Sequence, residues 1–389
     1  MIEIIFWTMF AIVFYTYLGY GILVYFLTKG KRKPDFKLNH PENTSLTVVH
    51  LIAAYNEQDY IEEKITNSLN LDYPTDQYQV WVVTDGSTDK TPDIVRDYPN
   101  VTHFHEDARK GKIHAVNRVM PHINADIVVF SDANTHINKV AIKNMIQHFH
   151  NEKVGVVAGE KRIHIDEKDE ASSAGEGLYW KYESFLKQKD YALYSTVGAA
   201  GELFAIRTSL FEEVSEDMLI EDFYLSMSIA AKGFVIAYEP DAYAVEHSSA
   251  SVKEESKRKI RIAAGGLQAT WRLKHLFNVF RYKWLSFQFV SHRVLRWTLA
   301  PLFLPFILIL NGILASTSSG LYVGLFGLQL LFYLLALIGW VLQFIKTKIK
   351  VFFIPFYFVF MNIAVYLGFV RLMRGKQSVL WARAERKTT

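Results

Sequence analysis

The chain has 389 residues, of which 50% are hydrophobic and 15% aromatic, and its formal net charge at pH 7 is only +4. This small charge gives no support to nucleic-acid binding, and we expect no nucleic acid among its partners. The absence of cysteine excludes disulfides, thiolate metal sites and cysteine nucleophiles. Because the hydrophobic residues gather at both ends of the chain, we expect membrane segments around a more polar middle.

The N-terminal segment, 1–30, is predicted to be a transmembrane helix. Residues 2–27 carry a single charged residue, Glu3, and are long enough to cross a hydrocarbon core of about 30 Å. A cleavable signal peptide is the alternative, but the basic cluster at 29–33 follows the apolar stretch instead of preceding it. By the positive-inside rule, the chain after this cluster should lie in the cytoplasm.

The C-terminal region, 298–372, is predicted to contain three further hydrophobic segments. It is interrupted at 316–320 and at 346–350, and the second, basic interruption should be cytoplasmic. The basic tail, 373–389, also favours the cytoplasm, whereas three full crossings would leave it outside. We therefore expect one segment to be re-entrant or interfacial, and Pro355 points to the last one, although both arrangements stay open from sequence alone.

Residues 251–297 are predicted to form amphipathic helices in the membrane interface. Basic residues alternate there with Trp, Phe and Leu, which suits contact with anionic lipids. A pair of solvated amphipathic helices is the alternative.

The middle of the chain, 46–250, alternates apolar runs with amphipathic stretches, which is typical of an α/β domain with a mainly parallel sheet. The apolar runs at 46–53, 80–83 and 127–130 predict buried strands. Apolar residues at helical spacing predict a helix over 61–69.

Three acidic clusters lie in this domain. Asp85 and Asp132 each follow a predicted strand, and Glu221-Asp222 begins a predicted helix. Because open α/β sheets bind ligands at the carboxyl ends of their strands, a nucleotide and a metal ion would fit there. Ordinary capped turns are the alternative for the first two clusters, and stabilisation by the helix dipole is the alternative for the third.

Two neighbouring motifs suit a diphosphate and a cation. Lys112 follows Gly111 at a predicted helix start, where backbone N–H groups and an ammonium bind phosphate, although a solvated basic loop is equally consistent. Asp132 and Asn134 place oxygen ligands at alternate positions, which suits Mg²⁺ or Mn²⁺ bridging a diphosphate.

Taken in chain order, these motifs resemble those of the family 2 glycosyltransferases over about residues 46–265. The motifs are Ala54-Tyr55-Asn56-Glu57, Asp85-Gly86-Ser87-Thr88-Asp89, Gly111-Lys112 with Asn117, Ser131-Asp132-Ala133-Asn134, residues 198–207 and Glu221-Asp222. With its flanking hydrophobic segments, the chain is similar to the membrane-integrated branch that includes hyaluronan, cellulose, chitin and poly-N-acetylglucosamine synthases.

The resemblance implies an α/β GT-A fold with N-terminal and C-terminal transmembrane helices. It implies transfer, with inversion, from a nucleotide-sugar donor, with a UDP-sugar as first choice and Mg²⁺ or Mn²⁺ as cofactor. The acceptor would be a lipid-linked molecule or a glycan, in the synthesis of cell-surface polysaccharide or glycolipid. The protein would be integral to a membrane, in contact with its lipids and expected in a bacterial inner membrane, with the catalytic domain cytoplasmic.

The resemblance also implies roles for individual residues. Asp222 would be the general base, Glu221 would orient it or share its site, and the acceptor would bind over a floor of small residues. The donor site would comprise Ala54, Tyr55, Glu57, Asp85, Lys112, Asp132 and Arg261, the metal ligands would be Asp132 and Asn134, and the acceptor site would comprise Ala200, Gly201 and Glu202.

Two departures from the family pattern bear on function. Asn134 stands where the family often has a second aspartate, and an amide oxygen binds a divalent cation more weakly than a carboxylate does. The polymerising members carry Gln-x-x-Arg-Trp, of which only Arg261 matches in the stretch 258–262. We therefore expect transfer of a single sugar. A processive synthase, a non-catalytic nucleotide-binding membrane protein and a nucleotidyltransferase are the alternatives.

Overall fold

The computed structural model describes residues 1–30, 46–164, 170–247, 252–317, 320–344 and 349–375. The three basic stretches used above to assign sidedness, 29–33, 346–350 and 373–389, lie largely outside the described residues.

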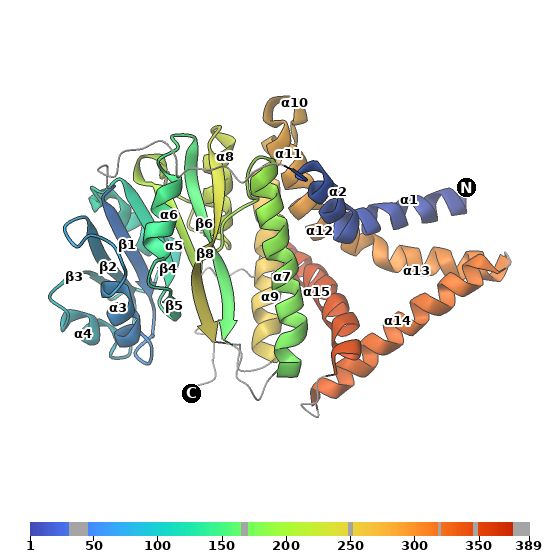
Figure 1. Cartoon of the computed structure of the whole chain (residues 1–389). Coiled ribbons are helices and arrows are strands. Elements are labelled where there is room, and N and C mark those ends of the chain that lie inside the picture. The colour runs from blue at the N-terminus through green and yellow to red at the C-terminus, as the bar shows by residue number, and fades with distance from the viewer. Residues whose placement is uncertain (31–45, 165–169, 248–251, 318–319, 345–348, 376–389) are drawn as a thin grey trace.

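An eight-stranded sheet forms the centre of the domain, in the order β3-β2-β1-β4-β7-β6-β8-β5. Figure 1 shows this sheet with helices packed on it, set to one side of the apolar helices. The strands are β1 (Val48–Ala54), β2 (Tyr78–Asp85), β3 (Val101–Glu106), β4 (Ile127–Asp132), β5 (Thr135–Ile137), β6 (Val154–His164), β7 (Leu203–Arg207) and β8 (Val235–His247).

The predicted apolar runs become the parallel half of the sheet, in which β1 pairs with both β2 and β4. All residues of β1 are buried because helices cover both faces. Val49 and Leu51 pack in one core cluster, whereas Ile52 packs with Ile61 and Ile65 on the opposite face. The helices near the sheet are α3 (Ile61–Leu69), α4 (Thr91–Arg96), α5 (Lys112–Val119), η2 (Met120–His122), α6 (Ala141–His148), η4 (Thr208–Leu210) and α8 (Glu221–Ala231).

The sheet is mixed: four of its strand pairings are parallel, in line with the predicted mainly parallel sheet, and three are antiparallel. β7 runs antiparallel to both of its neighbours, β4 and β6, and β5 runs antiparallel to β8. The reason lies in where β7 begins, because Leu203 is the register partner of Ser131 near the end of β4. A strand that enters the sheet from that edge must run against β4. The segment before β7 therefore lies beside the carboxyl end of β4.

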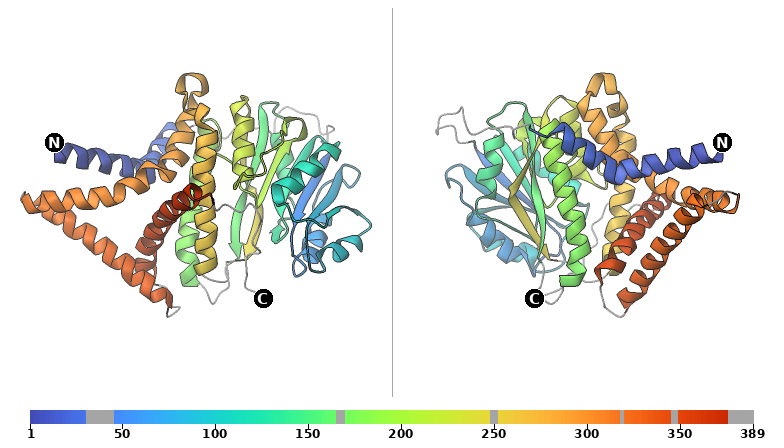
Figure 2. Two further views of the ribbon diagram at one scale, coloured as in Figure 1. Left: turned by 180° about the vertical axis from the view of Figure 1, so that it is seen from behind. Right: turned by 45° about the vertical axis from the view of Figure 1, so that its right-hand side comes forward.

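Two long helices, α7 (Glu170–Leu193) and α9 (Val252–Arg272), stand between the sheet and the apolar helices (Figures 1 and 2). α7 is not among the predicted elements, since its polar and apolar residues form no clear stripe. The connection from α9 to the apolar helices consists of η5 (Lys274–Phe277), α10 (Val279–Tyr282), α11 (Trp284–Phe289), the π-helical η6 (Val290–Val294) and α12 (Leu295–Trp297).

Four helices in the described part of the chain are long and apolar enough to cross a membrane. They are Ile2–Leu27, made of α1 (Ile2–Phe14), the π-helical η1 (Tyr15–Gly19) and α2 (Tyr20–Leu27), followed by α13 (Leu299–Thr317), α14 (Leu321–Phe344) and α15 (Lys350–Met373). α15 stays helical through Pro355. It is the most buried of the four helices, because 39% of its most apolar 18-residue stretch is buried within the protein. Gly368 allows it to approach α9, since a Cβ there would lie 2.8 Å from the backbone nitrogen of Ala264.

We expect the α14–α15 contact to depend on Gly339. A Cβ at this position would lie 2.2 Å from the carbonyl oxygen of Phe352, a backbone atom that cannot rotate away, whereas a Cβ at Gly327 of the same helix would meet nothing within 4 Å. Gly339→Ala should therefore cost about 1–3 kcal/mol and lower the melting temperature of the detergent-solubilised protein. Gly327→Ala is the matched control, and equal melting temperatures for the two variants would contradict this packing.

Candidate active site

Asp85, at the end of β2, organises one side of the site. Its carboxylate accepts hydrogen bonds from the backbone N–H groups of Lys110, at 3.1 Å, and Gly111, at 2.6 Å. The close approach requires Gly86, which has φ +63°, because a Cβ there would lie 2.6 Å from the Cα of Arg109. Asp85 thus fixes the segment that leads into α5, and its Oδ1, which accepts only from Lys110 among the described residues, keeps a lone pair for a ligand.

A pocket of about 240 Å³, open mouth included, lies beside this carboxylate. The Arg109 guanidinium lies 3.8 Å from the centre of the Tyr55 ring, so two flat groups face each other at its wall. Planar groups of this kind suit a nucleobase. The lining residues are Ala53, Ala54, Tyr55, Val83, Asp85, Arg109, Gly111, Lys112 and Ala115.

The structure brings four of the predicted donor residues, Ala54, Tyr55, Asp85 and Lys112, to this pocket. Glu57 lies outside the lining, and its backbone N–H donates to the Thr91 hydroxyl at 2.9 Å. Arg109 was not predicted, although it begins the basic run that contains Lys112, and that run was the available signal.

Lys112 is the point at which four elements meet. From the start of α5, its Nζ reaches Asp132 Oδ1 at the end of β4, at 2.8 Å, and Glu221 Oε1 at the start of α8, at 3.2 Å. A Cβ at Gly201, before β7, would lie 3.3 Å from Asp222 Oδ2 and 3.4 Å from Lys112 Nζ. Predicted donor, catalytic and acceptor residues therefore share one small volume.

The electrostatics of this cluster give Asp222 an unusual carboxyl group. Burial, and then the neighbouring Glu221 carboxylate, raise the pKa of Asp222 to about 7, while Lys112 opposes the shift. The pKa of Lys112 is itself raised, because the attraction of Asp132 and Glu221 outweighs burial, so this lysine stays charged. A carboxyl group with a pKa near 7 is suited to accept a proton at physiological pH.

The predicted metal ligands, Asp132 and Asn134, flank the turn after β4. The described residues contain no group of three or more His, Cys, Asp or Glu side chains arranged for a metal ion. The chain thus offers one carboxylate and one amide oxygen, and Mg²⁺ is typically held by one or two carboxylates together with substrate phosphates. The residues present fit a divalent cation that is bound jointly with a diphosphate.

The predicted acceptor floor precedes β7, and its shape depends on Gly198. This residue has φ +83°, and a Cβ there would lie 2.2 Å from the ring of Phe223, the residue after Asp222. Ala200 and Gly201 contribute only small side chains to the floor. Glu202 forms an ion pair with Lys161 of β6, and Lys161 also pairs with Glu246. Lys161 was not predicted and no motif pointed to it.

Arg261 lies on α9 and is not among the residues that line the pocket. One turn further along, Gly265 packs against Ile220, since its Cβ would lie 2.8 Å from Ile220 Cγ2. The half-buried Arg261 makes no hydrogen bond or ion pair within the part of the chain that the structure describes. Gln268 does not occupy the glutamine position of Gln-x-x-Arg-Trp. Its side-chain oxygen instead accepts a hydrogen bond from the Leu219 N–H at 3.1 Å and so holds the segment before Glu221.

Comparison with known proteins agrees with this geometry. Residues 50–215 match the family model described as Glycosyl transferase family 2. The probable glycosyltransferase YdaM of Bacillus subtilis (strain 168) is 26% identical over 425 residues, which cover 98% of this chain and 95% of that protein. The poly-beta-1,6-N-acetyl-D-glucosamine synthase of Staphylococcus aureus (strain MSSA476) is 27% identical over 262 residues, covering 65% of this chain and 61% of the synthase. The chain thus spans about three fifths of the synthase.

The fold also has a solved counterpart. The mannosyltransferase PcManGT from Pyrobaculum calidifontis, in complex with GDP-Man and Mn²⁺, superposes with a TM-score of 0.72 at 23% sequence identity. The match covers 97% of this chain and 100% of that structure. The likeness confirms the predicted GT-A fold, and the match over residues 50–215 agrees with the predicted family without extending to the rest of the chain.

We expect Gly86→Ala to weaken nucleotide binding about tenfold, the effect of about 1.4 kcal/mol, by pushing the Arg109 segment away from Asp85. Gly233→Ala is the matched control, because Gly233 also has positive φ but a Cβ there would meet nothing within 4 Å. Titration of the purified variants with UDP and GDP would measure the effect. Equal affinities would mean that the Asp85 contact does not shape the pocket.

Proposed function

We propose that the chain, whose residues 50–215 match the family model described as Glycosyl transferase family 2, is an inverting membrane glycosyltransferase. It transfers a single sugar from a nucleotide sugar, with a UDP-sugar as first choice, to a lipid-linked or glycan acceptor in cell-surface polysaccharide or glycolipid synthesis. The observation that carries the proposal is the meeting of Lys112, Asp132 and Asp222 over Gly201. Lys112 would then bind the diphosphate, Asp132 would bind a metal ion and Asp222 would act as the base, all around one sugar.

Donor binding follows from the pocket. The base lies against Tyr55 and Arg109, and the diphosphate extends toward Lys112 and the backbone N–H groups at the start of α5. Asp132 and Asn134 would hold Mg²⁺ or Mn²⁺, which neutralises charge on the leaving diphosphate when bound. Arg261 of α9 would supply a further cation for the diphosphate.

The transfer step needs a base on the side of the sugar opposite the diphosphate. The acceptor hydroxyl lies over Gly201 and gives its proton to the Asp222 carboxylate as its oxygen bonds to the anomeric carbon. The bond from that carbon to the diphosphate oxygen breaks in the same step, so the configuration inverts and the nucleoside diphosphate leaves with the electron pair. Glu221 keeps the pKa of Asp222 high and shares Lys112 with Asp132.

The four apolar helices support a membrane location. We place the catalytic domain on the cytoplasmic side by the positive-inside rule, with a bacterial inner membrane as the expected setting. A lipid-linked acceptor then reaches the site from the side of α7 and α9, which face the apolar helices (Figure 1). A processive synthase is the second candidate, because a similar protein bears the name of a synthase. The departure from Gln-x-x-Arg-Trp around Arg261 favours the first candidate.

We expect activity to rise with pH through about 7 and to level off above it, because Asp222 acts only when ionised and its pKa is raised to about 7. Glu221→Gln should move this limb to lower pH, since it removes a negative neighbour that raises the pKa of Asp222. The measurement is the rate of nucleoside diphosphate release at saturating donor from pH 5 to about 9. An unchanged limb in Glu221→Gln would argue against Asp222 as the titrating base.

The decisive test of function is transfer by the purified full chain in detergent, supplied with membrane extract and a panel of UDP-, GDP- and dTDP-sugars with Mg²⁺ or Mn²⁺. We expect one donor to be used, one sugar to be added, and Asp222→Asn to lower the rate by about 10²–10⁴-fold without loss of nucleotide binding. Glu213→Gln, an exposed carboxylate shortly before α8, is the control. A long polymer would move the protein to the synthases, and full activity of Asp222→Asn would overturn the mechanism.

A further inference from the structure

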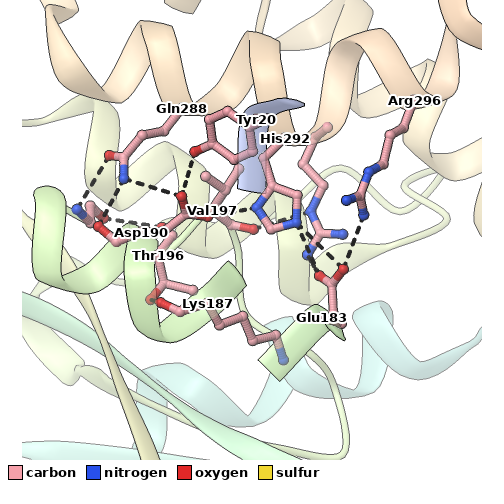
Figure 3. A network of polar contacts seen from close by, with 11 residues as sticks. Tyr20, Glu183, Lys187, Asp190, Thr196, Val197, Gln288, His292 and Arg296 are labelled. Atoms are coloured by element: carbon pink, nitrogen blue, oxygen red, sulfur yellow. Dashed lines mark hydrogen bonds and ion pairs between the residues drawn. The ribbon is translucent and has the colours of Figure 1, made fainter. Parts of the chain in front are cut away.

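A buried cluster of charged and polar side chains lies outside the active site, where the first apolar helix meets the catalytic domain (Figure 3). We call it the junction cluster. It draws on α2, on α7 and on the stretch from α11 to α12, three segments far apart in sequence. Its members are Tyr20, Glu183, Asp190, Gln288, His292, Arg293 and Arg296.

Asp190 is the first centre of the junction cluster and is fully buried. Its carboxylate accepts from the Tyr20 hydroxyl of α2 and lies 2.6 Å from His292 Nδ1. Its backbone oxygen accepts from Gln288 Nε2 at 2.8 Å. One residue of α7 thus binds both the apolar α2 and the connection that follows α9.

Glu183 is the second centre, two turns earlier on α7. Arg293 lies 2.5 Å and Arg296 3.2 Å from its carboxylate, and His292 Nε2 lies 3.3 Å away. Burial opposes its ionisation, but Arg293, His292 and Arg296 together hold the pKa of Glu183 well below its usual value. Buried ion pairs usually add little net stability over apolar packing. Stability alone is therefore a weak reason for this arrangement.

The backbone around the junction cluster is unusual as well. The π-helical η1 ends just before Tyr20, and the π-helical η6 contains His292 and Arg293. The two π-helical segments touch, since the Tyr15 hydroxyl lies 2.8 Å from the Ser291 hydroxyl. Single π-helical turns are rare and occur often at functional sites.

The junction cluster also contacts the chain just before the acceptor floor. Arg293 Nε donates to the carbonyl oxygen of Val197 at 3.4 Å, and Gln288 Oε1 accepts from the Ser195 N–H at 3.3 Å. Val197 precedes Gly198, which packs directly on Phe223 beside Asp222. A continuous set of contacts therefore leads from α2 to the residues that carry the acceptor and the base.

Nucleotide binding should depend less directly on the junction cluster than the acceptor floor does. No junction-cluster residue is among those lining the nucleotide pocket, which lies at the ends of β1 and β2 and the start of α5. A disturbance of the junction cluster should therefore reach the acceptor floor and leave nucleotide binding in place.

We propose that the junction cluster positions the acceptor floor, residues 198–202, against Asp222, and that Arg293 is the positioning residue that makes this connection. The inference rests on the proposed function and adds to it a requirement for α2 in the transfer step. Arg296 supplies the matched comparison, because it pairs with the same carboxylate from the same connection and is not bonded to Val197 in the described structure.

The test compares Arg293→Lys with Arg296→Lys in the full chain in detergent. Both changes keep a positive charge near Glu183, but lysine cannot hold Glu183 and donate to Val197 from a second nitrogen. We expect sugar incorporation from membrane extract to fall about tenfold in Arg293→Lys and less than about twofold in Arg296→Lys. The affinity for the nucleoside diphosphate of the active donor should change less than about twofold in both.

A second pair guards against simple misfolding. Tyr20→Phe removes the bond from α2 to Asp190, whereas Tyr17→Phe removes a bond from the same apolar helix to Asn362 of α15, outside the junction cluster. Incorporation should fall in Tyr20→Phe and persist in Tyr17→Phe. Equal losses within both pairs, or a parallel loss of nucleotide affinity, would overturn the inference. A wild-type protein that incorporates no sugar from any donor would instead overturn the proposed function, and this inference with it.

Discussion

The site depends on one buried ammonium group. Lys112 lies between Asp132 and Glu221, with Asp222 close by, and without it three carboxylates would meet in a poorly solvated space. Like charges at such distances repel strongly where water is scarce. The lysine thus allows α5, the end of β4 and the start of α8 to converge. The ammonium also limits the rise in the pKa of Asp222 that burial and Glu221 cause.

The mixed sheet places different structural elements on the two sides of this charged cluster. The parallel strands β1, β2 and β4 end together and leave a shelf for a nucleotide, as open α/β sheets do. Because β7 enters from the same edge in the opposite direction, it brings Gly201 against the ion cluster from the other side. The proposed donor and acceptor surfaces thereby come from different parts of the chain and meet at Lys112.

Much of this arrangement could be predicted, because strong local signals marked it. Continuous apolar runs marked β1, β2 and β4, and the polar residues at their ends, Asp85 and Asp132, marked the site. What could not be predicted depends on pairing across the sheet or between distant helices. Nothing near Leu203 indicates an antiparallel strand, nothing near Lys161 indicates its two glutamate partners, and the partners of Asp190 come from residues 20, 288 and 292. Such contacts leave no periodic trace in the sequence.

The position of Lys112 has a consequence for the sequence of binding events. Its ammonium lies where it would be 3.4 Å from a Cβ at Gly201, directly above the acceptor floor. If the proposed donor diphosphate draws this ammonium toward the nucleotide pocket, the space over Gly201 opens for the proposed acceptor. We therefore expect the donor to bind before the acceptor, through the displacement of one side chain and without a moving lid.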